Sequence, residues 1–231
     1  MDILLLLLQV HFTTRQNKKI VFLGDSITQG IGTTSMDKVY WNVIAQRTGA
    51  ICVGDGIGGT RIARQLGASP DSPVGQLHFP VRVDKLDADA DIVAVFGGTN
   101  DYGHGNAPFG SMTDRTEDSF YGAMHVLCQK LIERYPEAQL LFMTPLHRCG
   151  ENQSALNEWG LRRDHTLADY VEAIREVAAF YSIPVLDLYR VSGIVPDQVV
   201  QKERFMPDGV HPNDAGNARI AEKVIAFLHT L

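Results

Sequence analysis

The stretch IVFLGDSIT, residues 20–28, places a serine directly after four apolar residues. A short apolar run of this kind predicts a buried strand, and the glycine and aspartate that follow predict a turn at its carboxyl end. Enzymes built on parallel sheets keep their reactive groups at this position, so Ser26 is a candidate nucleophile. A Gly-Asp-Ser triplet occurs often by chance, and its weight depends on the residues downstream.

A base and an acid stand at a compatible place near the C-terminus, in the block DGVHP at residues 208–212 just before the last predicted helix. A serine hydroxyl is a poor nucleophile until a nearby base takes its proton, and histidine is the side chain best suited to this near neutral pH. His211 supplies the imidazole, and Asp208, three residues earlier in a tight turn, can orient it. Taken alone, the same block would read as a surface turn that caps a helix.

Two further blocks supply hydrogen-bond donors. Gly58 and Gly59 follow the second apolar run, and the block GTND at residues 98–101 follows the third. The backbone N–H groups of Ser26 and Gly59 and the side-chain amide of Asn100 therefore stand at three strand ends, where they can converge on the oxyanion of a tetrahedral intermediate. Three converging donors suit acyl transfer.

The four blocks, in this order, resemble the SGNH or GDSL family of serine esterases and acylhydrolases, and the resemblance runs from the first strand to the C-terminus. It implies that Ser26 is the nucleophile, His211 the base and Asp208 the third member of the triad. It also implies that Gly59 and Asn100 complete the oxyanion hole.

The second block departs from the family pattern. The family usually has asparagine where Gly54 stands and often serine where Gly58 stands. Polar contacts from those two side chains are missing here.

Short apolar runs alternate with longer periodic stretches along the rest of the chain. The pattern predicts strands near residues 20–23, 51–53, 91–96, 140–143 and 185–188, and helices near 37–48, 117–135, 166–181 and 214–228. Such alternation predicts an α/β three-layer sandwich with a five-stranded parallel sheet in flavodoxin-like order, which is also the SGNH hydrolase fold. We expect one domain over residues 20–231.

Residues 1–19 form a predicted N-terminal extension, either an edge strand or a disordered or partner-bound tail. The apolar run at 3–8 is too short to span a bilayer, and Asp2 precedes it where a signal peptide carries Lys or Arg. A misassigned start codon or a truncated chain would also account for it. With Cys52, Cys128 and Cys149 forming no close pair, we expect reduced thiols and a cytoplasmic location.

The net charge of −6 and the pI near 5.7 exclude a basic surface for nucleic acid. We expect a small-molecule or carbohydrate ester as substrate, and neither cofactor nor metal. Several polar and aromatic residues near the strand ends are candidates for substrate contact, with a solvated turn or simple packing as the alternative for each. They are Asp25, His104, His147, Arg148 and Trp159.

The segment 102–119 is the longest predicted irregular stretch, and it leaves the third strand beside Asn100. Carrying Pro108 and Phe109, it is expected to wall the acyl side of the site and so to favour short acyl groups. The sequence thus predicts hydrolysis of a short-chain ester, with acetyl preferred, possibly on a carbohydrate. A thioesterase or a lysophospholipase on the same fold is the alternative.

Two other chemistries compete. Residues 54–59 match G-x-G-x-x-G after a strand, through Gly54, Gly56 and Gly59, which raises a dinucleotide-binding oxidoreductase. That interpretation requires a following helix and strand, and the Pro-rich stretch after residue 68 predicts neither. A metallohydrolase would need His104, His147, Cys149 and His211 to meet, although their spacing matches no ligand pattern.

Overall fold

The structure is a computed structural model that describes residues 17–66, 73–152, 156 and 164–231. Its centre is one parallel sheet with strand order β2-β1-β3-β4-β5, which confirms the predicted α/β fold and flavodoxin-like order. The strands are β1 (Lys19–Gly24), β2 (Ile51–Gly56), β3 (Ile92–Phe96), β4 (Gln139–Met143) and β5 (Val185–Leu186). Of the predicted extension, residues 1–16 lie outside the described part of the chain.

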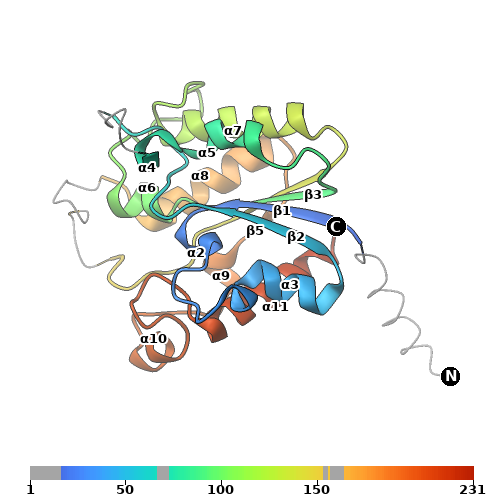
Figure 1. Ribbon diagram of the computed structural model, residues 1–231. Coiled ribbons are helices and arrows are strands. Elements are labelled where there is room, and N and C mark those ends of the chain that lie inside the picture. Colours follow the sequence, from blue (N-terminus) through green and yellow to red (C-terminus); the bar gives the residue numbers. More distant parts are fainter. Residues whose placement is uncertain (1–16, 67–72, 153–155, 157–163) are drawn as a thin grey trace.

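Helices cover both faces of this sheet (Figure 1). One face carries α5 (Phe79–Arg82), α7 (Phe120–Arg134) and α8 (Leu167–Phe180), and the other carries α3 (Tyr40–Thr48), α9 (Leu188–Val191) and α11 (Asp214–Leu228). The shorter elements are α2 (Ser26–Gln29), α4 (Pro73–Gln76), α6 (Thr99–His104) and α10 (Val199–Phe205), with 3₁₀ turns η1 (Met36–Lys38) and η2 (Val83–Lys85).

Alternation along β1 divides the core into two layers. Val21 and Leu23 pack with α5, α7 and α8, whereas Ile20 and Phe22 pack with α3, α9 and α11, and all four side chains are buried. A central strand buried on both faces is continuously apolar, which is why the run at 20–23 was informative. The layer of α7 also contains the buried thiol of Cys128.

One long helix starts later than predicted because a side chain caps it. The helix predicted near 117–135 begins at Phe120 because the Ser119 hydroxyl accepts a hydrogen bond from the backbone N–H of Gly122. The predicted irregular stretch at 102–119 begins later than expected, because residues 99–104 form α6. None of the helices in the described ranges has both the length and the apolar character that a bilayer span requires.

Asn217 joins α3 and α11 on one face of the sheet. This fully buried side chain accepts a hydrogen bond from the N–H of Tyr40, the first residue of α3, at 3.0 Å. Its amide donates to the carbonyl oxygens of Pro212 and Asn213, at 2.8 and 3.2 Å. Asn217 therefore fixes α11 and the loop before it against the start of α3.

We predict that Asn217→Ala lowers the free energy of unfolding by about 2–4 kcal/mol, because it strands buried backbone groups that have no route to water. Asn42→Ala is the matched control, since Asn42 donates to the Met36 carbonyl at an exposed position on α3. Its effect should stay within about 0.5 kcal/mol. Urea unfolding of the three proteins measures both, and equal effects would contradict the role given to Asn217.

Candidate active site

The sequence blocks meet at the carboxyl edge of the sheet. Ser26 begins α2 directly after β1, Gly59 lies in the loop after β2, and Asn100 lies in the first turn of α6 after β3. His211 lies in the loop between α10 and α11. Figure 1 shows α2, α6 and α10 grouped at this end of the molecule.

A chain of two hydrogen bonds joins Ser26, His211 and Asp208. The Nε2 atom of His211 lies 2.9 Å from the Ser26 Oγ, and its Nδ1 lies 2.7 Å from an Asp208 carboxylate oxygen. An imidazole that donates from Nδ1 to the carboxylate leaves Nε2 as an acceptor for the serine proton. This is the arrangement that activates a serine hydroxyl.

Asp208 is held by its own turn. Its Oδ1 accepts the backbone N–H groups of Val210 and His211, at 2.8 and 2.7 Å. Burial raises the pKa of Asp208, but these N–H groups and the imidazole outweigh that effect and hold the pKa below its usual range. Gly209 has a φ of +84°, and a side chain there would meet Cys149 at 2.5 Å. The turn therefore needs glycine at this position.

The loop after β2 lies beside the serine. A Cβ at Gly58 would lie 3.7 Å from the Ser26 Cβ and 2.8 Å from the Gln29 side-chain oxygen, which accepts the Gly58 N–H at 2.7 Å. Gln29 thus explains why glycine stands where the family often has serine. The sequence pattern did not single out Gln29, because its role depends on α2 folding back against this loop.

Trp41 explains why glycine stands at position 54, where the family usually has asparagine. A Cβ at Gly54 would lie 2.4 Å from the Trp41 indole, so this ring fills the space that an asparagine side chain would need. The indole N–H donates to the Thr28 carbonyl at 2.9 Å. An apolar ring on α3 therefore replaces a polar contact below the site.

The candidate oxyanion donors are fixed from several sides. Gly59 has a φ of +75°, a left-handed conformation that favours glycine. The buried Asn100 amide donates one hydrogen to the carbonyl of Thr60, at 2.9 Å, and keeps its second hydrogen for another acceptor. In the described structure no hydrogen bond is made by the Gly59 N–H, which leaves this donor available.

Asp101 anchors the same loop further along. Its two carboxylate oxygens accept the backbone N–H groups of Ile62 and Ala63, both at 2.9 Å. Burial raises the pKa of Asp101 to about 7, against the opposing effects of these N–H groups and of the Arg61 charge. The Asn-Asp pair after β3 therefore holds the loop after β2 at two points, through Thr60 and through Ile62 and Ala63.

The sequence profile of the GDSL-like lipase/acylhydrolase family matches residues 22–219. The chain belongs to this family. It is 24% identical to a GDSL lipase of Mycobacterium tuberculosis over 220 residues, which cover 90% of this chain and 80% of that one. These findings identify a carboxylic ester hydrolase.

Solved structures share the fold. A protein from Lactobacillus plantarum is 32% identical, with a TM-score of 0.78 and coverage of 93% of this chain and 98% of that chain. The aryl esterase of M. smegmatis is 20% identical, with a TM-score of 0.67 and coverage of 93% and 99%. The similarity to the second protein shows the fold alone.

Two candidates for substrate contact have other partners in this GDSL-like protein. The buried Asp25 carboxylate accepts the N–H of Ile27 at 3.0 Å and caps α2. Arg148 is also buried, donates to the Thr99 carbonyl at 3.1 Å and lies over the Tyr102 ring. Both side chains are therefore buried and bonded within the protein.

His147 remains at the surface of the site edge. Its Nδ1 lies 2.8 Å from the buried carboxylate of Glu151, which also accepts the hydroxyl of Tyr189 at 2.8 Å, and the two rings lie 3.7 Å apart. Glu151 escaped sequence analysis because a lone glutamate in a loop normally faces solvent. His104 ends α6, where its carbonyl accepts from Arg61, and Trp159 lies outside the described residues.

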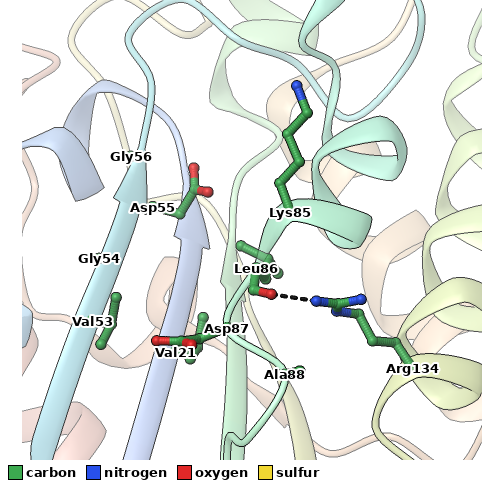
Figure 2. Close-up of a pocket in the computed structure, with 10 residues that line it drawn as sticks. All are labelled: Val21, Val53, Gly54, Asp55, Gly56, Lys85, Leu86, Asp87, Ala88 and Arg134. Atoms are coloured by element: carbon green, nitrogen blue, oxygen red, sulfur yellow. Dashed lines mark hydrogen bonds between the residues drawn. The ribbon is translucent and has the colours of Figure 1, made fainter.

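The dinucleotide alternative gains no support from the structure. Residues 57–66, after the glycine motif, form turns and irregular chain, so the helix N-terminus that would bind a pyrophosphate is not there. Gly54 and Gly56 line a cavity of about 610 Å³ beside the edge strand β2, together with Lys85 and Arg134 (Figure 2). Arg134 donates to the Leu86 carbonyl, and Ser26, His211 and Asp208 are not among the residues that line this cavity.

The metal alternative has no geometric basis either. Within the described ranges, no three side chains among His, Cys, Asp and Glu are placed to hold one metal ion. His211 is bonded to Asp208 and Ser26, and His147 to Glu151.

The Asp25 carboxyl gives this site a pH dependence of stability. Burial raises its pKa to about 6, and the Ile27 N–H and the charges of His211 and Arg82 oppose the shift. Because the folded-state pKa lies above the unfolded value, ionisation of Asp25 costs stability as the pH rises from about 4 to above about 6.

We predict that Asp25→Asn, which keeps an oxygen for the Ile27 N–H, gains stability relative to the parent over this pH range, by up to about 3 kcal/mol. Urea unfolding of both proteins at several pH values between about 4 and about 7 measures the difference. A difference that does not change with pH would show that the carboxyl does not carry a raised pKa.

Proposed function

We propose that the protein hydrolyses short-chain carboxylic esters, acetyl esters above others, through an acyl-serine intermediate on Ser26. The observation that carries this proposal is the chain of hydrogen bonds from Asp208 through His211 to Ser26. A base hydrogen-bonded to a serine hydroxyl, and itself oriented by a carboxylate, is suited to activate that hydroxyl for attack on an ester carbonyl carbon.

In the first half of the reaction, Ser26 Oγ attacks the ester carbonyl carbon while its proton passes to His211 Nε2. The carbonyl oxygen becomes an oxyanion, which accepts hydrogen bonds from the N–H groups of Ser26 and Gly59 and from the Asn100 amide. Asp208 stabilises the imidazolium through Nδ1. The imidazolium then gives its proton to the departing alkoxide oxygen, the alcohol leaves, and the acyl group stays on Ser26.

In the second half, water takes the place of the alcohol. His211 accepts a proton from the water as its oxygen attacks the acyl carbon, and a second tetrahedral intermediate forms on the same donors. Collapse of this intermediate breaks the bond to Ser26 Oγ, which recovers its proton from His211. The products are the carboxylic acid and the free enzyme.

The proposed preference for a short acyl group rests on a rigid wall beside the oxyanion donors. The segment that follows Gly59 and the segment that follows Asn100 bond to each other at several points. Arg61 donates to the His104 carbonyl, Asn106 pairs with the backbone of Leu66, and Arg64 pairs with Asp118. A long acyl chain needs an open apolar groove, and two loops joined in this way leave little freedom to form one.

The contacts of Phe109 in the structure differ from those expected from the sequence. Phe109 stacks against Phe120 at 6.1 Å and packs edge-on against Tyr170, in the layer of α7 and α8. The segment is therefore anchored in the core, and Phe109 is not a flap over the serine. An apolar side chain, that of Val74, lies beside Gly59: a Cβ placed on Gly59 would lie 3.3 Å from the Val74 Cγ1.

For the alcohol, we propose a polar group such as a sugar. The partly exposed His147 ring lies in the segment after β4 and is held by Glu151 and Tyr189, so its orientation is fixed. A fixed imidazole is well suited to bind a hydroxyl group.

The proposal is tested first at the nucleophile. Ser26→Ala should abolish turnover of p-nitrophenyl acetate, whereas Ser111→Ala, at an exposed position in the loop before α7, should retain it. Retained turnover in Ser26→Ala would overturn the proposed function.

We predict that Asn100→Ala lowers kcat by roughly 10²–10³ with little change in KM, because its amide acts on the charge that develops in the transition state. Steady-state kinetics with p-nitrophenyl acetate separate the two constants. A loss confined to KM would instead place Asn100 in substrate binding.

We predict that kcat/KM falls from p-nitrophenyl acetate through butyrate to octanoate, a series in which the leaving group is constant. Val74→Ala should make this fall less steep, because it removes the apolar side chain beside Gly59. Val200→Ala, on the exposed surface of α10, is the control and should leave the series unchanged. Values that rise toward octanoate would support a lysophospholipase instead.

A further inference from the structure

Arg82 is a buried cation below the proposed site. It is the last residue of α5, its exposed fraction is 1%, and it is among the largest fully buried side chains of the described structure. No sequence motif marked it, since an arginine in an irregular stretch normally faces solvent. Its position therefore calls for a physical reason.

The guanidinium group joins three segments of the carboxyl edge. Nη1 donates to the carbonyl oxygen of Gly24, at the end of β1, at 2.9 Å, and to the Thr60 hydroxyl at 3.0 Å. Nη2 donates to Asp55, at the end of β2, through both the main-chain carbonyl and the carboxylate. The planar fork of arginine is suited to such divergent bonds.

Two of these partners lie close in sequence to a proposed oxyanion donor. Gly24 lies two residues before Ser26, and Thr60 directly follows Gly59. The Thr60 hydroxyl accepts from Arg82 while it donates to the Ile57 carbonyl at 2.7 Å, and the Thr60 carbonyl accepts from Asn100. Arg82 and Asn100 therefore fix opposite sides of one residue, and through it the loop that carries Gly59.

Burying the Arg82 cation costs stability, which indicates that its role is to fix the geometry of the segments to which it is bonded. Among the described residues, the carboxylate that is hydrogen-bonded to Arg82 is that of Asp55, whose side chain is 30% exposed and lines the cavity of Figure 2. In the described structure the Arg82 Nε is buried without a hydrogen-bond partner. Apolar side chains fill such a space at lower cost than a charge that is incompletely paired, so stability alone does not account for arginine here.

We infer that Arg82 is a positioning residue for the oxyanion hole, because it sets the Gly59 N–H relative to the Ser26 N–H through bonds to Thr60 and Gly24. This inference rests on the proposed function. Arg82 is bonded to protein groups and is buried beneath the loop, so it does not touch the substrate. Its loss should therefore act on the transition state and spare ground-state binding.

The test compares Arg82→Met and Arg82→Lys with the parent. Methionine fills similar space without donors, and lysine keeps the charge but loses the fork. We expect kcat for p-nitrophenyl acetate to fall roughly 10-fold to 100-fold in Arg82→Met, with a smaller fall in Arg82→Lys and little change in KM. Arg134→Met removes a partly buried arginine that donates to the Leu86 carbonyl, and it should leave kcat unchanged.

A second measurement separates positioning from general loss of structure. Phenylboronic acid forms a tetrahedral adduct with an active serine, so its affinity should fall by about the same factor as kcat/KM in each variant. Thr60→Val removes the intermediate partner, and its combination with Arg82→Lys should cost less than the product of the single effects. If Arg82→Met does not fold, Thr60→Val and Arg82→Lys, alone and combined, provide the test.

Three outcomes would overturn the inference: unchanged kcat in a folded Arg82→Met, a loss confined to KM, or boronate affinity that does not follow kcat/KM. A separate variant, Ser26→Ala, tests the proposed function. If Ser26→Ala retains turnover, the proposed function fails, whatever the Arg82 variants do.

Discussion

The hydrogen bond between the Ser26 hydroxyl and the His211 imidazole joins residues that stand 185 positions apart in the chain. Much of the fold serves to make that distance 2.9 Å. The serine is fixed by β1, which lies between β2 and β3 in the sheet and is buried on both faces. The histidine lies just before α11, which packs against α3, and the fully buried Asn217 holds the two helices together. A small relative shift of these two supports would break the bond.

A buried polar layer lies beneath this contact. Asp25, Asp101 and Arg82 are all buried near the carboxyl ends of the strands, where Asp25 caps α2, Asp101 bonds the loop after β2, and Arg82 bonds the end of β1. Burial raises the pKa of both carboxyl groups, which shows that the fold gives up stability there. In return, loops that carry few apolar contacts of their own acquire fixed positions. Rigid support of this kind is what preorganised donors require.

Sequence patterns foretold the strands and the long helices because each has a clear apolar period and many buried side chains. Short elements were missed for the same reason. A six-residue helix such as α6, which includes Gly103, and the four-residue α5, which includes Pro80, have too few residues to show a period. The sequence also named Ser26, His211 and Asp208, which the structure joins by hydrogen bonds, since the blocks that contain them are recognisable without coordinates.

The sequence did not predict which polar and charged side chains are buried. Asp25 and Arg148 were sensible candidates for substrate contact, being polar and near strand ends, yet both point into the protein. Glu151 and Arg82 looked like solvated charges, and both proved to be buried centres of hydrogen-bond networks. Whether a charged residue faces water or the core depends on the packing of segments far away in sequence.

The central claim is that an acyl group is held on Ser26 during turnover. Mass spectrometry of enzyme quenched in the steady state with p-nitrophenyl acetate, followed by peptide mapping, tests it most directly. The account predicts one acetyl group per enzyme molecule, on the peptide that contains Ser26, while turnover proceeds. Acetylation confined to another residue, with Ser26 unmodified while turnover proceeds, would contradict it.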